Sequence, residues 1–152
     1  MEPLIVPNDI FFSHIIDEIN SHNIVRIPVK GNSMLPFIRP FSDEIELTEL
    51  NEKSFEKGNI VLGKTKENRY IVHRIEKVKQ DTIILRGDGN LSLREICDKN
   101  NIFAEVTSVY RSNIKIEKNS FRWNLAKYCW FSNPLLRRVF LKTYRIFNKI
   151  GN

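Results

Sequence analysis

The feature of this 152-residue sequence that most limits its fold is a series of six short runs rich in β-branched and other apolar residues. Segments containing the turn-forming residues Gly, Asn, Asp and Pro separate them. The runs cover residues 24–30, 43–50, 59–64, 69–78, 82–87 and 102–111. Strands this short and closely spaced favour a twisted, partly closed antiparallel sheet over alternating strands and helices. We therefore predict a mainly β protein with a coiled, barrel-like sheet.

Both ends of the chain carry helical patterns instead. Apolar residues recur at helical spacing over residues 8–22, where Asn8 is a suitable N-cap behind Pro7. The aromatic C-terminal stretch indicates two helical pieces, broken near residues 132–134. We expect three parts, which are an N-terminal helical segment 1–22, a β-rich domain 23–117 and a basic aromatic helical tail 118–152.

Charge is divided unevenly between the body and the tail. All 18 acidic residues lie at or before Glu117 with 16 of the 24 basic residues, which leaves eight basic residues and no acid in 118–152. In the last helical piece, one face is apolar and another basic. The apolar face holds Leu136, Val139, Phe140, Tyr144, Phe147 and Ile150, and the basic one Arg138, Lys142, Arg145 and Lys149.

Three interpretations of this amphipathic tail are open. It could cap the sheet with its polar face in solvent, or it could contact a membrane surface or a partner through residues 121–150. Nucleic-acid binding is the third, and it predicts a steep salt dependence. We expect no nucleic-acid partner.

Few features of the sequence indicate the cellular compartment. Cys97 and Cys129 lack the spacing of metal ligands, and we interpret both as free thiols. The N-terminus has no basic segment followed by an apolar core, and no apolar run reaches the ~18 residues of a membrane span. We expect a cytoplasmic protein whose residues 121–150 can rest on the inner face of the membrane.

One serine occupies a position where an enzyme could use it. Ser33, in the stretch VKGNSMLPF, follows a Gly-Asn pair at the end of a strand-like run and precedes Pro36 by three places. The simplest interpretation is an ordinary turn, and the alternative is a nucleophile presented at the rim of the sheet. A serine hydroxyl becomes a good nucleophile only when a base takes its proton.

Two other residues could complete such a site. His73 lies within a predicted strand, where alternation places it beside Ile71 and Ile75. It is either a core histidine with bonded nitrogens or a base in a dry site. Asp88, in the stretch RGDGN, either bonds its own turn or holds the imidazole so that its other nitrogen accepts the serine proton.

The order of these motifs adds information that no single motif carries. Gly-x-Ser-Met-x-Pro, Lys-Gly-Asn-Ile-Val, Tyr-Ile-Val-His-Arg-Ile and Arg-Gly-Asp-Gly-Asn follow one another between residues 29 and 109. This succession resembles the motifs of the signal peptidase I superfamily, which includes the self-cleaving SOS repressors. With histidine at position 73, the chain resembles the Ser-His branch. The resemblance implies Ser33 as nucleophile, His73 as general base and Asp88 as its support, without metal or cofactor.

The resemblance also implies a fold and a substrate. It suggests the signal peptidase/SOS-repressor C-terminal-domain fold, in which a peptide or protein substrate binds as an added strand and is cleaved after small side chains. Asn32, Met34 and Pro36 flank the serine, and we expect them to shape the substrate site and the oxyanion hole.

The sequence departs from the family pattern at several places, and two of them concern the catalytic site. Gly31 stands where signal peptidases commonly have a serine that assists the oxyanion hole. The second acidic residue of the Ser-His branch is not at its usual place, and Glu95 and Asp98 are the nearby candidates.

Two functions therefore remain open. The first is a serine endopeptidase that acts on a peptide or leader segment with a Ser-His(-Asp) mechanism. The second is a non-catalytic peptide-binding module of the same fold that docks to a membrane or partner through its basic tail. Self-cleavage of the repressor type is disfavoured, because the sequence contains no Ala-Gly bond and only about 32 residues precede Ser33.

Overall fold

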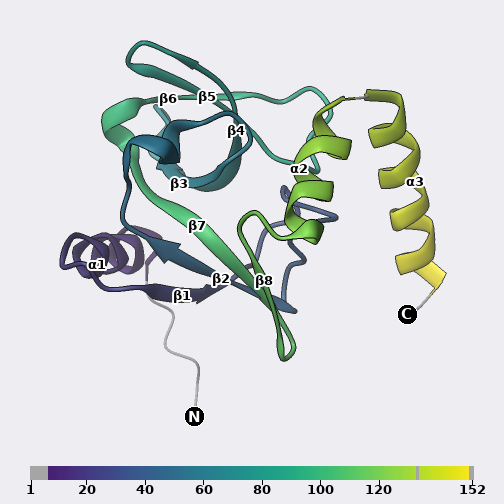
Figure 1. Ribbon diagram of the computed structural model, residues 1–152, viewed down its shortest axis with the longest axis horizontal. Helices are drawn as coiled ribbons and strands as arrows, with labels where there is room; N and C mark the ends of the chain where they lie inside the picture. The colour runs from purple at the N-terminus through teal and green to yellow at the C-terminus, as the bar shows by residue number, and fades with distance from the viewer. Residues whose placement is uncertain (1–6, 133, 151–152) are drawn as a thin grey trace.

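A single antiparallel sheet dominates the computed structural model, which describes residues 7–132 and 134–150 (Figure 1). For residues 129–132, 134 and 147–150 only the backbone is described. The strands are β1 (Val25–Pro28), β2 (Asp43–Thr48), β3 (Ile60–Lys64), β4 (Tyr70–Lys79), β5 (Thr82–Arg86), β6 (Glu95–Asp98), β7 (Ile102–Arg111) and β8 (Ile114–Glu117). The helices are α1 (Asn8–Asn20), α2 (Phe121–Ser132) and α3 (Pro134–Ile150), with short 3-10 turns at Glu52–Phe55 and Lys99–Asn101.

The sheet is open, which corrects the barrel-like closure that we expected. Its strand order is β1-β2-β7-β3-β4-β5-β6, with β8 paired to β7. The end strands β1 and β6 have four residues each and each pairs with one neighbour. Two such short strands offer few backbone groups for closing the sheet on itself. The long strand β7 joins two halves, because its first residues pair with β3 and its later ones with β2 and β8.

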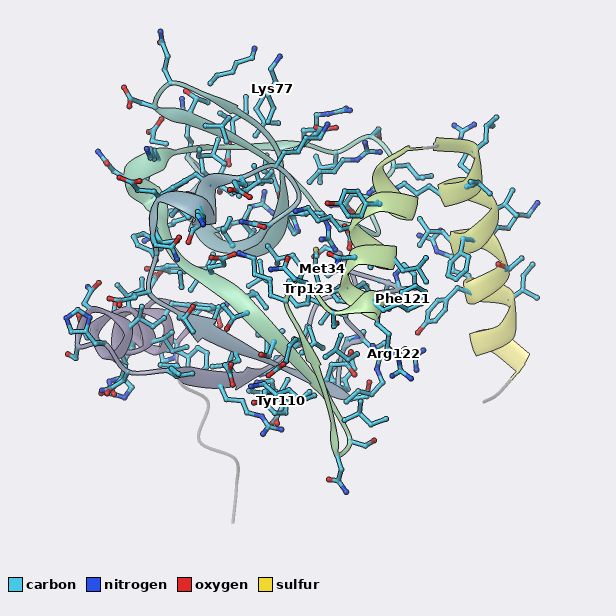
Figure 2. All side chains as sticks on the ribbon, in the orientation of Figure 1. Met34, Lys77, Tyr110, Phe121, Arg122 and Trp123 are labelled. Atoms are coloured by element: carbon cyan, nitrogen blue, oxygen red, sulfur yellow. The ribbon has the colours of Figure 1, made fainter. Side chains whose placement is uncertain are left out.

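The apolar core lies on both faces of the central strands. In β3, Ile60 and Leu62 pack into one cluster with α1, β2 and β7, while Val61 packs into a second cluster with β5 and β6. Met34 of the serine turn and Trp123 of α2, both labelled in Figure 2, belong to the first cluster. Burying a side chain of this size contributes roughly 2–3 kcal/mol. The serine turn and α2 are therefore both fixed to the same core.

The two helical ends agree with the predicted periodicity, with one correction. α1 begins at Asn8 itself, with Pro7 at the cap position and no side-chain capping bond, so the prediction of Asn8 as N-cap was wrong. The helical tail is divided where predicted, since α2 ends at Ser132 and α3 begins at Pro134. Figure 1 shows α1 at the left of the view and the α2–α3 pair at the right, with much of the sheet between them.

The tail helix α3 docks through residues other than its predicted apolar face. Arg137 and Leu141 are buried, whereas Leu136, Val139 and Phe140 are more than half exposed. The alternative in which this apolar face caps the sheet therefore does not hold for these three residues. The side chains of Phe147, Lys149 and Ile150 lie outside the described part of the chain. No helix in the described ranges is both long and apolar enough to cross a bilayer.

The structure describes the side chain of one of the two cysteines that we expected to be free thiols. Cys97 on β6 is a free thiol in the second core cluster. Burial raises the pKa of this thiol to about 11, so it stays protonated and unreactive near neutral pH. The side chain of Cys129 lies outside the described part of the chain.

Candidate functional site

The serine turn is held against the turn that follows β5. Ser33 lies in an irregular turn after β1, and its carbonyl oxygen accepts a 2.7 Å hydrogen bond from the amide of Gly89. A Cβ atom at position 89 would lie 2.8 Å from the carbonyl oxygen of Asn32. A residue without a side chain is therefore needed for the close approach.

A second glycine brings the imidazole of His73 to the same place. A Cβ atom at Gly87 would overlap the carbonyl oxygen of Ser33 and would lie 3.1 Å from Nε2 of His73. Because position 87 carries no side chain, three segments distant in sequence meet here. They are the serine turn, β4 with His73, and the turn after β5.

The imidazole of His73 lies between a carboxylate and the serine turn. Its ring is buried, and Nδ1 contacts the side-chain carboxylate of Glu95 on β6, which is also buried. The other Glu95 oxygen lies 3.5 Å from a guanidinium nitrogen of Arg69. Nε2 faces Gly87 and the serine turn. A carboxylate on one ring nitrogen and a hydroxyl-bearing turn by the other is the arrangement that a serine nucleophile requires.

Ser33 and His73 are thus brought together. Both line one groove, and no hydrogen bond joins the hydroxyl of Ser33 to the ring among the described residues. Catalytic hydrogen bonds are often long in ligand-free sites and tighten when substrate binds.

Asp88 does not contact the imidazole, contrary to the expected supporting role. Its two carboxylate oxygens accept hydrogen bonds of 2.9 and 2.6 Å from Nε and Nη2 of Arg74. Adjacent residues of a strand point to opposite faces, so Arg74 and His73 meet different partners. Arg74 pairs with Arg86 in the β4–β5 ladder, and Asp88 follows two residues later in the turn after β5. Glu95 takes the place that we expected for Asp88.

The buried Arg74–Asp88 pair predicts a large loss of stability when one partner is removed. Arg74 is fully buried and also donates to the carbonyl oxygen of Gly58 at 2.8 Å. The substitution Arg74→Ala would leave the Asp88 carboxylate buried without its guanidinium partner, so we expect a loss of about 3–5 kcal/mol in the free energy of unfolding. Urea denaturation followed by circular dichroism measures it.

A matched control exists on the surface. Arg94 also donates hydrogen bonds from two nitrogens to a carboxylate, that of Glu76, but the side chain of Arg94 is about half exposed. Arg94→Ala should cost at most about 1 kcal/mol, since exposed pairs contribute little. Equal losses in the two variants would contradict the assigned importance of the buried pair.

The three residues expected around the serine have different environments. The side chain of Met34 is buried in the core, Asn32 is exposed, and Pro36 is half-buried after a cis peptide bond with Leu35. The backbone amides of Ser33 and Met34 donate to no group within the described residues. Met34 can therefore serve an oxyanion through its amide, and its side chain fixes that amide in place.

A groove of about 790 Å³ passes the serine. We call it the apolar groove; its walls include Phe11 and Phe12 of α1, residues 27–31, Ser33 and Tyr70–His73 of β4. The amides of Lys30 and Gly31 bond no described group. Residues 70–73 pair with β3 on one side only, because β5 pairs with β4 from Arg74 onward. Both walls thus leave backbone groups for an added peptide strand.

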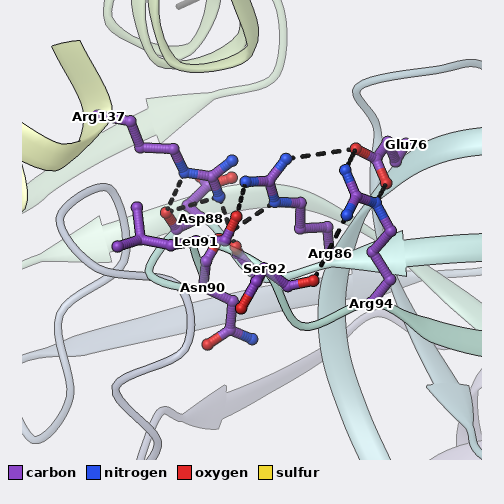
Figure 3. A network of polar contacts seen from close by, with 9 residues as sticks. Glu76, Arg86, Asp88, Asn90, Leu91, Ser92, Arg94 and Arg137 are labelled. Atoms are coloured by element: carbon purple, nitrogen blue, oxygen red, sulfur yellow. Dashed lines mark hydrogen bonds and ion pairs between the residues drawn. The ribbon is translucent and has the colours of Figure 1, made fainter. Parts of the chain in front are cut away.

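Arg137 of α3 reaches the turn behind this site, and sequence reasoning missed it. Its guanidinium donates to the carbonyl oxygens of Gly87 (2.7 Å) and Asp88 (2.9 and 3.1 Å) (Figure 3). Arg86 binds the next part of the turn, donating to the carbonyl oxygen of Asn90 at 3.1 Å. Burial and then the charge of Arg86 lower the pKa of Arg137 to about 10, so it remains charged at neutral pH. In the sequence, Arg137 is one more residue of a basic helix.

The described residues hold no cluster of three or more His, Cys, Asp or Glu side chains that could bind a metal ion. In comparisons with known proteins, no family model, no curated protein and no solved structure matches this chain. The functional conclusion therefore depends on the geometry of the Ser33–His73–Glu95 site.

Proposed function

We propose that the protein is a serine endopeptidase that cleaves a peptide or leader segment after a small residue. The observation that carries this proposal is the position of the His73 ring, with Glu95 at Nδ1 and the Ser33 turn beside Nε2. Ser33 is the nucleophile, His73 the general base and then acid, and Glu95 the residue that orients the ring. Preference for a small residue is taken from the motif resemblance alone.

The chemistry follows from the two nitrogens of the ring. A carboxylate at Nδ1 favours the tautomer with its proton on that nitrogen, which leaves the lone pair of Nε2 free. Nε2 takes the proton of the Ser33 hydroxyl as the oxygen attacks the scissile carbonyl carbon. The same proton is then given to the leaving amine, and water later hydrolyses the acyl-enzyme.

The negative oxygen of the tetrahedral intermediate needs donors close to Ser33. The amides of Ser33 and Met34 are suitable, because neither is used by another described group. One such donor typically contributes about 3 kcal/mol to transition-state stabilisation. Two backbone donors can thus serve where Gly31 supplies no hydroxyl.

Covalent labelling tests the nucleophile directly. A peptidyl phosphonate should add once to the wild-type protein, and intact-mass measurement should show that adduct lost in Ser33→Ala. Ser13→Ala is the matched control, because Ser13 is an exposed serine on α1. An adduct that persists in Ser33→Ala, or the absence of both an adduct and any cleavage of a peptide library, counts against the proposal.

A non-catalytic peptide-binding module is the second candidate. It is favoured by Gly31, which offers no side-chain donor, and by the groove with unpaired backbone groups on both walls. On this alternative, wild type and Ser33→Ala bind the same peptides equally and neither cleaves them.

We propose a cytoplasmic location with a peripheral membrane contact through residues 121–150. This is supported by the large apolar side chains exposed on the two tail helices, which are Phe121, Leu125, Leu135, Leu136, Val139, Phe140 and Ile146. Such side chains, together with the excess of basic residues from residue 118 onward, suit an anionic lipid surface.

A further inference from the structure

A second groove begins next to the nucleophile and is walled by α3. It has a volume of about 670 Å³, and we call it the basic groove. One wall comes from the serine turn and the turn after β5. The opposite wall is α3, and the residues around the groove include Asn32, Gly89, Arg138, Lys142 and Arg145. Asn32 directly precedes Ser33 in the chain, and the amide of Gly89 donates to the carbonyl oxygen of Ser33. The groove therefore begins at the residues next to Ser33.

The charge in this groove is positive and uncompensated. Arg138, Lys142 and Arg145 line it, and no acidic residue does. All three side chains are exposed and form no ion pair with any described residue. Several cations of the β-rich body pair with a carboxylate instead, as Arg74, Arg94 and Arg111 do. The tail itself supplies no carboxylate, because the last acidic residue is Glu117.

The position of this basic wall is fixed by the site itself. Arg137, next to Arg138 on α3, is buried and donates to the carbonyl oxygens of Gly87 and Asp88. The same turn also holds the serine turn, because the amide of Gly89 donates to the carbonyl oxygen of Ser33. The cations are consequently held at a set place relative to the nucleophile.

We propose that the basic groove binds an acidic segment of the substrate, on the opposite side of the scissile bond from the segment in the apolar groove. This inference rests on the proposed function and names its substrate class. The two grooves meet neighbouring residues of the serine turn, since Gly31 and Ser33 line the first and Asn32 the second, so a substrate strand that passes Ser33 can continue toward the basic groove. The substrate is then a peptide with small or apolar residues on one side of the cut and Asp or Glu on the other.

Binding of labelled peptides tests the inference without requiring turnover. The probes are three fluorescein-labelled peptides that share one apolar segment and carry a neighbouring segment with three Glu, three Gln or three Lys. The protein is the full chain with Ser33→Ala, measured by fluorescence anisotropy. We expect the Glu peptide to bind at least tenfold more tightly than the Gln peptide, and the difference to shrink as salt is raised.

Charge reversal on α3 locates the site. The double variant Lys142→Glu/Arg145→Glu should weaken binding of the Glu peptide by about 10- to 100-fold and improve binding of the Lys peptide, because each pair changes from attraction to repulsion. The matched control is Lys77→Glu/Lys79→Glu, which makes the same change in net charge at exposed positions of β4 and should leave the order of the three peptides unchanged.

The outcomes separate this inference from the proposed function. Cleavage of Glu and Gln peptides with equal kcat/KM by the wild type, and unchanged binding after the α3 reversal, would overturn the inference while the peptidase stands. Selective binding of the Glu peptide without any cleavage would support the groove and count against the peptidase. The last measurement is binding of the protein and the α3 reversal variant to vesicles of phosphatidylserine and phosphatidylcholine. If the α3 reversal abolishes vesicle binding but leaves peptide binding intact, these cations serve a membrane and the inference fails.

Discussion

Replacing Ser33 with alanine is expected to lower kcat for peptide cleavage by about 10⁵- to 10⁶-fold, because no other group can form the acyl-enzyme at this position. Its hydroxyl accepts and donates no hydrogen bond among the described residues, and the side chain is half-buried at the rim of a groove. The fold should therefore survive the change, with the free energy of unfolding altered by less than about 0.5 kcal/mol. Kinetics on a cleavable peptide and urea denaturation measure the two quantities.

The combined variant shows whether Ser33 and His73 act as one unit. His73→Gln should reduce kcat by a similar factor, and Ser33→Ala/His73→Gln should be no slower than either single variant, since groups that act in one step are not additive. Glutamine keeps a polar group beside the buried carboxylate of Glu95. Losses that multiply in the double variant would show two independent effects and contradict the shared mechanism.

Periodicity predicted the longer strands and missed the short polar ones. In β4 and β7, runs of ten residues with β-branched side chains are recognisable without tertiary context. β6 and β8 have four residues each, half of them charged, and owe their pairing to the strands beside them. The open ends of the sheet could not be predicted either, because closure depends on how much edge the terminal strands offer.

Tertiary structure also decides which acidic residue lies beside His73. Alternation along β4 places His73 and Arg74 on opposite faces, and it does not say which acid reaches which face. Glu95 reaches the imidazole because β6 pairs with β5, a contact invisible in the sequence. A short motif such as RGDGN points to Asp88, yet the nearest cation, Arg74, binds both of its oxygens. Motifs indicated Ser33 and His73, while sheet pairing determined which carboxylate lies beside the imidazole.

The two acids should therefore respond differently to loss of charge. Glu95→Gln is expected to lower kcat by about 10⁴-fold, because an amide beside Nδ1 no longer favours the tautomer that leaves Nε2 free, and it cannot stabilise the imidazolium. Asp88→Asn should instead reduce the free energy of unfolding by roughly 1.5–3 kcal/mol, since two hydrogen bonds to Arg74 lose their charged acceptor. Its effect on kcat should remain within about tenfold. Peptide kinetics and urea denaturation on both variants distinguish these losses.

The reverse result would reassign the supporting role. If Asp88→Asn removed turnover while stability was unchanged, and Glu95→Gln left kcat intact, Asp88 would have to approach the ring when substrate binds. Arg74 argues against that movement, because the carboxylate would leave a guanidinium that is fully buried and bonded to it through two nitrogens. Breaking such a pair costs about 3–5 kcal/mol, which a substrate would have to supply by binding. Glu95 contacts the ring without any such rearrangement, and we therefore expect the charge on residue 95 to set the rate.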